Sequence, residues 1–356
     1  MSIVTTASYA SDKAGQACGF DVSALVAYLH GTLGFVGEIR DVRKFSSGQS
    51  NPTYLLATSA GRFVLRRKPS GKLLPSAHAV DREFAVMKAL RSNGTVPVPE
   101  PLVLCEDDAV IGSAFYVMTY EDGRIFADPA LPELDRPDRE AVYADLVRTL
   151  AALHEVDVDA AGLAAFGKAG HYYERQLGRW RKQYRATETE TIAEVERLMD
   201  WLAVNLPAEE ARPALIHGDF RLENMVYERA GPRLKAVLDW ELSTLGDPLA
   251  DLGHLCMSVG LPDLPPFRGV DAKDRERLGV PTNEAMVARY CALRGIDYPA
   301  DWAFHIAFAY FRYAAITQGV YRRSLEGNAS NETAAEAGRA VRPLAELGLA
   351  EAAAAR

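Results

Sequence analysis

Residues 214–226 read A-L-I-H-G-D-F-R-L-E-N-M-V. Short apolar runs stand on each side of a polar segment, a pattern that predicts two buried strands joined through a hairpin tip. The tip carries the imidazole of His217, the carboxylate of Asp219 and the carboxamide of Asn224. Asp and Asn are also common in ordinary turns, so these groups have to be judged together with the residues that follow.

A second carboxylate, Asp239, ends the later apolar run in V-L-D-W-E at residues 237–241. The alternation of strands and turns would bring Asn224 and Asp239 to the same edge of a small ribbon. A carboxylate and an amide oxygen, completed by phosphate oxygens, suit Mg²⁺. Asp219 would lie one side chain away, where it could accept a hydrogen bond from a hydroxyl and align it with a terminal phosphate. In the alternative interpretation, Asp239 only caps a following helix.

The two stretches H-G-D-F-R-L-E-N-M-V and V-L-D-W-E-L-S-T-L-G-D-P-L-A-D-L-G together resemble the signature of aminoglycoside-phosphotransferase-like kinases, relatives of the choline and protein kinases. The D-x-x-x-x-N spacing is present at Asp219 and Asn224, and D-W-E stands where protein kinases have D-F-G. The resemblance implies an α+β, bilobal protein-kinase-like fold with a small antiparallel-sheet N-lobe and a mainly helical C-lobe. It also implies ATP and Mg²⁺ as cofactors, Asp219 as the catalytic residue, and Asn224 and Asp239 as metal ligands.

Hydrophobic periodicity along the chain fits this two-lobed order. We expect an N-terminal nucleotide-binding lobe over residues 1–120, in which 1–20 form a loose arm, and a C-lobe with the catalytic loop and acceptor site over 121–356. The N-lobe pattern predicts helices at 22–33 and 80–93, and strands at 40–45, 53–58, 62–67, 102–105 and 114–120. The C-lobe pattern predicts helices at 139–155, 171–186, 188–204, 248–259, 283–294, 301–324 and 330–353, and short strands at 214–216, 225–227 and 235–239.

The resemblance further implies a phosphate-binding loop in F-S-S-G-Q-S-N-P-T-Y, residues 45–54. Backbone N–H groups are expected to face the nucleotide phosphates there. The residues concerned are Ser47, Gly48, Gln49, Ser50 and Asn51.

F-V-L-R at 63–66 occupies the place of the V-A-I-K strand of kinases. Val64 would cover the adenine, and Arg66 stands where the family usually has lysine, with Lys68 as the alternative cation. A guanidinium can bind phosphate oxygens bidentately, so the role can survive the exchange. Glu83 in the following helix would orient Arg66 through an ion pair.

Y-V-M-T-Y-E-D-G at 116–123 resembles the hinge between the lobes. Met118 would lie behind the adenine, and backbone groups of Thr119 and Glu121 would bind its edge. His217 and Asp251 resemble residues that support the backbone of the catalytic loop.

The acceptor site is expected near an aromatic and basic segment at 170–184. Candidate acceptor contacts are Tyr173, Arg175, Trp180 and Tyr184, with Arg179 and Arg181 as further cations. The nearest pattern is the kinase-like domain found fused to acyl-CoA dehydrogenases, which also resembles residues 67–84. That similarity implies a hydroxy-acid or hydroxyacyl-thioester acceptor rather than a polycationic aminoglycoside. Core packing is the alternative for the aromatic residues, and it is our interpretation of His154, His254 and His305.

Composition excludes several other classes. The net charge is −8, and the 40 basic residues are spread along the chain, which argues against nucleic-acid binding. Four cysteines stand far apart, so neither a zinc site nor a disulfide framework is indicated, and a reducing cytoplasm suits them. No signal peptide or long apolar segment is recognisable, so no membrane association is expected. The oligomeric state stays open.

Two other functions remain possible at this point. The missing lysine and the single loop glycine are compatible with a nucleotide-binding pseudokinase or regulatory module that transfers no phosphate. The carboxylates could also serve a metal-dependent hydrolase. Protein-kinase activity is disfavoured, because G-D-P follows D-W-E within six residues and leaves no room for an activation loop.

Overall fold

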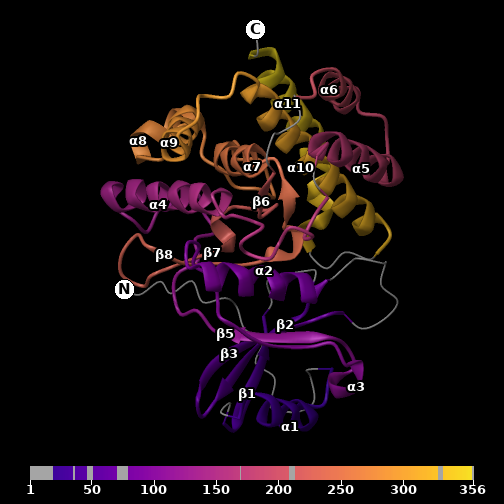
Figure 1. Ribbon diagram of the computed structural model, residues 1–356. Helices are drawn as coiled ribbons and strands as arrows, with labels where there is room; N and C mark the ends of the chain where they lie inside the picture. Colours follow the sequence, from indigo (N-terminus) through magenta and orange to yellow (C-terminus); the bar gives the residue numbers. More distant parts are fainter. Residues whose placement is uncertain are drawn as a thin grey trace.

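The computed structural model has two lobes stacked along one axis (Figure 1). It describes residues 19–34, 37–45, 51–69, 79–168, 170–207, 213–327 and 332–354. The architecture is the expected α+β kinase-like one, with a five-stranded antiparallel sheet in the N-lobe and a mainly helical C-lobe. The proposed division after residue 120 comes directly after β5 (Phe115–Thr119), which is the last strand of that sheet in sequence order. The proposed arm lies almost entirely outside the described residues.

The N-lobe sheet packs one face against helix α1 (Val22–Leu33), which begins at Asp21 because that carboxylate accepts hydrogen bonds from two backbone N–H groups of the first turn. The strand order is β1 (Ile39–Lys44), β2 (Thr53–Thr58), β3 (Gly61–Arg67), β5 (Phe115–Thr119) and β4 (Pro101–Cys105). Alternate residues such as Phe63 and Leu65 join α1 in a small core of their own. Val64 and Arg66 therefore point to the other face, toward the C-lobe.

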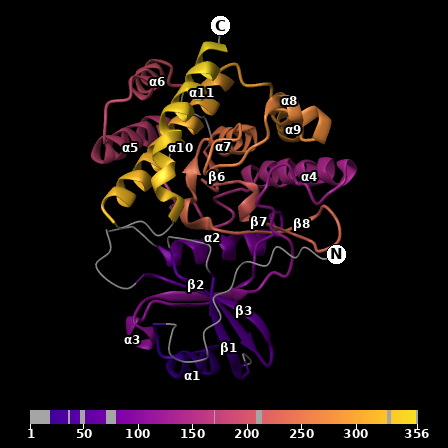
Figure 2. The same cartoon turned by 180° about the vertical axis from the view of Figure 1, so that it is seen from behind.

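Helix α2 (Val80–Asn93) lies between the sheet and the C-lobe in both ribbon views (Figures 1 and 2). Its apolar residues belong to the same hydrophobic cluster as the C-lobe core. The helix ends at Gly94, which adopts a left-handed conformation with φ 74°. A four-residue helix α3 (Asp108–Ile111), absent from the sequence-based prediction, joins β4 to β5. The core thus continues from the C-lobe into the inner face of the N-lobe.

The C-lobe helices follow the predicted order closely. They are α4 (Arg136–His154), α5 (Tyr172–Thr187), α6 (Ala193–Val204), α7 (Leu249–Gly260), α8 (Ala272–Leu278), α9 (Asn283–Arg294), α10 (Trp302–Leu325) and α11 (Val341–Ala354). Helix α8 was not predicted, and the segment expected as one helix at 330–353 divides into a 3₁₀ stretch η3 (Glu332–Ala340) and α11. Figure 2 shows α10 and α11 side by side at the front of the C-lobe in that view. No helix in the described part of the chain is long and apolar enough to cross a bilayer.

The predicted hairpin at 214–226 is wrong. Strand β6 (Ala214–Ile216) pairs with β9 (Thr244–Gly246), whereas β7 (Met225–Tyr227) pairs with β8 (Leu234–Val237). The 3₁₀ turn η1 (Leu222–Asn224) redirects the chain between β6 and β7, so these two strands belong to different ladders. A second turn, η2 (Trp240–Leu242), separates β8 from β9. Both polar loops still meet where the two small ladders adjoin.

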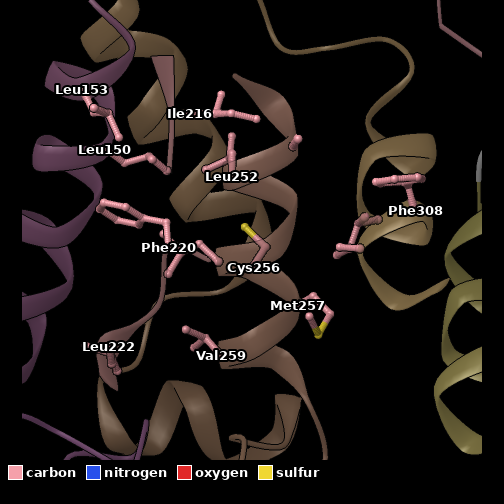
Figure 3. Packing of buried hydrophobic residues seen from close by; sticks show 14 of the residues in the cluster. Leu150, Leu153, Ile216, Phe220, Leu222, Leu252, Cys256, Met257, Val259 and Phe308 are labelled. Carbon is pink, nitrogen blue, oxygen red and sulfur yellow. The ribbon is translucent and has the colours of Figure 1, made fainter. Parts of the chain in front are cut away.

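Helix α7 anchors the loop between β6 and β7 from inside the C-lobe. Phe220 and Leu222 of this loop lie beside Cys256 and Val259 of α7, with Leu150 of α4 nearby (Figure 3). All five side chains are buried. Because the apolar residues of the loop fill the core, its polar residues are held at the surface of the cleft.

Candidate active site

The loop that carries Asp219 is held through its backbone. Asp251 of α7 accepts hydrogen bonds from the N–H groups of His217 and Gly218, at 2.6 and 2.8 Å. The ring of His217 donates from Nε2 to the carbonyl of Leu238 at 2.8 Å and accepts from the N–H of Asp219 through Nδ1 at 3.2 Å. Both residues therefore contact backbone, as the sequence analysis expected of them.

Gly218 permits this loop conformation. Its φ is +85°, and a Cβ atom there would lie 2.6 Å from the carbonyl oxygen of Leu242. Only glycine fits both the left-handed backbone and the close approach. The side chain of Arg312 donates to the carbonyl of Gly218 from α10.

The carboxylate of Asp219 is held by several donors. Oδ1 lies 2.9 Å from Nε2 of His254, and Oδ2 accepts from Asn224 at 3.0 Å and from Arg221 at 3.3 Å. Burial alone would raise the pKa of Asp219, but Arg221, His254 and Arg312 outweigh it and hold that pKa well below its ordinary value. Asp219 is therefore ionised, and its carboxylate can accept a hydrogen bond from a hydroxyl.

Asn224 and Asp239 are neighbours across the β7–β8 ribbon. The backbone N–H of Leu238 donates to the carbonyl of Asn224 at 2.8 Å. The Nδ2 group of Asn224 donates twice to Asp219, which leaves its side-chain oxygen as the available ligand atom. Asp239 adopts a left-handed conformation with φ 64°, and its carboxylate is one-third exposed.

This donor set fits Mg²⁺ bound together with a nucleotide. One amide oxygen and one carboxylate are too few for a protein-only metal cage, but they match the pattern in which phosphate oxygens complete the shell. Among the described residues, no cluster of three or more His, Cys, Asp or Glu side chains is suited to a metal.

Arg66 lies at the centre of a carboxylate cluster. Its Nε lies 2.9 Å from Glu83, and its Nη2 lies 2.6 Å from Asp239 and 3.0 Å from Glu241. The expected ion pair between Arg66 and Glu83 is thus present. The alternative cation, Lys68, lies 4.0 Å from Asp81 instead.

Glu83 is buried, and its oxygens also accept hydrogen bonds from Asn51 at 2.8 Å and from Tyr116 at 3.0 Å. Burial raises the pKa of Glu83 to about 7, and Arg66 offsets this only in part because Asp239 and Glu241 repel the same charge. Of the expected phosphate-binding loop, Asn51 thus contacts Glu83, whereas Ser47, Gly48, Gln49 and Ser50 lie outside the described residues.

The expected adenine wall is partly assembled. Val64 and Met118 are opposite each other in the β3–β5 register, so their side chains share the face that looks toward the C-lobe. The backbone N–H of Thr119, however, donates to Glu100 at 3.0 Å and is not free for a ligand. The side chain of Glu121 accepts from the Thr119 hydroxyl and pairs with Lys235.

A cavity of about 590 Å³ opens beside Asp219, whose side chain forms part of its lining. Its apolar wall is formed chiefly by Leu242, Met257, Val259, Leu261, Phe267, Ile316 and Val320. Four arginines line it, Arg221, Arg268, Arg312 and Arg323, against two carboxylates, Asp219 and Glu223. The cavity is therefore amphipathic and net positive.

The predicted acceptor residues lie away from this cavity. Tyr173, Trp180 and Tyr184 are at most 6% exposed and belong to the C-lobe core, and the side chain of Arg175 donates to the backbone of Lys168. None of the four lines the cavity. The helical spacing of the aromatics in α5 reflects packing, which was the alternative interpretation, so their placement does not support acceptor contacts.

Two residues of the cavity escaped the sequence analysis. His254 was interpreted as a core residue, and Arg312 lies nearly a hundred residues beyond the catalytic loop in an otherwise apolar helix. The only local signal for His254 is its position one turn after Asp251 on the same helix face. Nothing in the sequence around Arg312 indicates that it reaches Gly218.

A family model described as "Phosphotransferase enzyme family" matches residues 41–288. The chain belongs to this family. It is 48% identical over 91% of its length to acyl-CoA dehydrogenase family member 10 of Mus musculus, of which it covers 30%. The matched range includes parts of both lobes and the loops that carry Asp219 and Asp239. The chain spans less than half of the length of that curated relative.

Several solved structures match this phosphotransferase-family chain. The crystal structure of a candidate aminoglycoside phosphotransferase from Ralstonia eutropha JMP134 has a TM-score of 0.84 and 42% identity, over 95% of this chain and 99% of that one. An aminoglycoside phosphotransferase in ternary complex with ADP and hygromycin B has a TM-score of 0.60 and 14% identity, over 91% and 97% of the two chains, which shows the fold alone.

Proposed function

We propose that the protein is an ATP- and Mg²⁺-dependent kinase that transfers the γ-phosphoryl group to a hydroxyl of a small molecule. The observation that carries the proposal is the position of Asp219, which lines the acceptor-sized cavity and at the same time contacts Asn224. Membership of the phosphotransferase family and the ADP complex of a structural relative support the choice of nucleotide.

The residues of the chain would divide the work as follows. Asp219 accepts the hydrogen bond of the acceptor hydroxyl and orients its oxygen in line with the γ-phosphorus. It takes up the proton as the new O–P bond forms and the bond from the γ-phosphorus to the bridging oxygen breaks, with ADP as the leaving group. Arg66, held by Glu83, contacts the phosphates, and Asn224 and Asp239 would hold Mg²⁺. When bound, Mg²⁺ neutralises charge on the phosphates.

The acceptor is an anionic, partly apolar hydroxyl compound, in line with a hydroxy acid or a hydroxyacyl thioester. Four arginines against two carboxylates repel a polycation and attract a carboxylate or phosphate. Arg312 supports this most directly. It is 8% exposed, forms no ion pair in the described part of the chain, and contacts the Gly218 carbonyl and the ring of Trp180.

Substitution of the two carboxylates tests the proposal. Asp219→Asn should bind Mg²⁺–ATP within a few-fold of wild type and lose transfer by about 1,000-fold or more, since the hydroxyl is no longer oriented. Asp239→Asn should lose the Mg²⁺-dependent part of nucleotide binding. Asp274→Asn, at an exposed carboxylate on α8, is the matched control. Calorimetry with a non-hydrolysable ATP analogue and ADP release with a panel of hydroxy acids, hydroxyacyl thioesters, amino alcohols and aminoglycosides give the two readouts.

The outcomes separate the alternatives. Nucleotide binding without transfer to any acceptor would identify a pseudokinase. Normal transfer in both variants would show that the carboxylates do not have these roles.

A further inference from the structure

His254 contacts the carboxylate of Asp219 from inside the C-lobe. Its side chain is 4% exposed, lines the acceptor cavity and places Nε2 2.9 Å from Oδ1 of Asp219. The other ring nitrogen, Nδ1, is buried and has no hydrogen-bond partner among the described residues.

The proton on this ring can be assigned from its neighbours. Asp219 is ionised and can only accept, so the hydrogen lies on Nε2 of His254. Asp219 and Arg221 of the catalytic loop and Arg312 and Tyr313 of α10 face the ring. Burial lowers the pKa of His254, the two arginines lower it further, and the hydrogen bond to Asp219 does not fully compensate. His254 is therefore a neutral imidazole with hydrogen on Nε2.

Packing alone does not explain a histidine at this position. A buried nitrogen without a partner is unfavourable, because it loses its hydrogen bond to water on folding and gains none in exchange. An apolar side chain of similar size would avoid this penalty. The contact that only an N–H donor can make is the one to Asp219.

We propose that His254 is a positioning residue for phosphoryl transfer, which holds the carboxylate of Asp219 in one orientation through a neutral Nε2–H donor. The inference rests on the proposed function. A neutral donor fixes the carboxylate without a further full charge, whereas an imidazolium beside Arg221 and Arg312 would weaken the affinity of Asp219 for the proton of the acceptor. His254 itself does not contact the reacting atoms.

Two substitutions separate positioning from packing. His254→Leu removes the donor and also the unsatisfied nitrogen, so we expect an unchanged or higher Tm together with a fall in kcat of about 100-fold. The KM for ATP should stay within about two-fold, because the nucleotide contacts are untouched. His254→Gln can place an amide N–H near the position of Nε2 and should recover at least about ten-fold of the lost kcat. In the Asp219→Asn background, His254→Leu should have no further effect.

A spectroscopic measurement on the wild-type full chain is independent of turnover. Long-range ¹H–¹⁵N correlation spectra of the histidine rings should show His254 as the neutral Nε2–H form from about pH 6 to 8, with a shift on Asp219→Asn. Three results would each overturn the inference: an Nδ1–H form or imidazolium at pH 7, wild-type kcat in His254→Leu, or a joint loss of kcat and Tm that Gln does not restore. Absence of transfer by the wild-type chain to every acceptor would instead defeat the proposed function, while the ring spectra would still decide the contact.

Discussion

Arg66 shows how one side chain can link the two lobes at the proposed nucleotide site. It belongs to β3 of the N-lobe, and it contacts Glu83 of α2 as well as Asp239 and Glu241 of the C-lobe. The guanidinium meets these carboxylates through two different nitrogens, whereas a lysine would present all its donors from a single nitrogen. Arg66, which stands where the family usually has lysine, is shared among three carboxylates. Its positive charge therefore compensates the negative charge of Glu83 only in part.

The pH dependence of the free energy of unfolding should reveal that the charge of Glu83 is only partly compensated. The carboxyl group ionises near pH 4.5 in the unfolded chain and near 7 in the folded one, so between these values the folded state binds more protons. The free energy of unfolding should therefore fall by up to about 3 kcal/mol as the pH rises from 4.5 to 7. Glu83→Gln should abolish this slope in urea denaturation, whereas Glu100→Gln, at a half-exposed carboxylate, should retain it. An identical slope in Glu83→Gln would contradict the assignment.

Arg312 should determine the preference of the enzyme for a negatively charged acceptor. We expect Arg312→Met to raise the KM of a hydroxy acid by about ten-fold or more, because a charge-assisted hydrogen bond is lost. The KM of the methyl ester of the same acid should change little, and Arg312→Lys should retain part of the preference. Equal losses for acid and ester would mean that Arg312 acts only through Gly218.

At the scale of elements, strand pairing was the part that local sequence could not predict. The apolar runs around Asp219 do form strands, and the polar residues do lie in loops. The error was to pair β6 with β7. In the structure, β6 pairs with β9, which lies some thirty residues later in the sequence. A run of three residues carries no register information of its own, so its partner is chosen by the surrounding packing. The motif spacing survived this error because Asn224 and Asp239 flank β7 and β8, which do pair.

The catalytic loop depends on one glycine. Gly218→Ala should lower the free energy of unfolding by about 1–3 kcal/mol, since the left-handed backbone and the contact with Leu242 both oppose a side chain. It should also lower kcat by displacing Asp219. Gly178→Ala on α5, where a Cβ meets nothing within 4 Å, is the control and should stabilise the chain slightly. Chemical denaturation and steady-state kinetics compare the two, and equal effects would be inconsistent with a special role for Gly218.

At the scale of the molecule, the family motifs predicted the fold and placed Asp219 and Asp239 in loops, but they did not predict the walls of the cavity beside Asp219. Asp219, Asn224, Asp239 and Asp251 stand at spacings that the chemistry restricts. Arg312 belongs to α10, which is distant from the loop in the sequence and reaches it through the Gly218 carbonyl. Side chains that converge from distant helices leave no periodic pattern, and α5, whose aromatic stripe looked like a binding surface, uses that stripe for the core.

The two lobes should unfold together rather than separately. Val86 and Leu90 of α2 share one hydrophobic cluster with the C-lobe, and a backbone hydrogen bond of 2.9 Å joins Val237 to Pro97. A chain of residues 121–356 would expose this apolar surface, so we expect it to aggregate or to lack a cooperative transition. The full chain should show one transition by both near-UV circular dichroism and fluorescence. A folded truncated chain that releases phosphate in the presence of Mg²⁺ would contradict this coupling, and it would favour a hydrolase built from the C-lobe alone over a kinase that needs both lobes to hold its nucleotide.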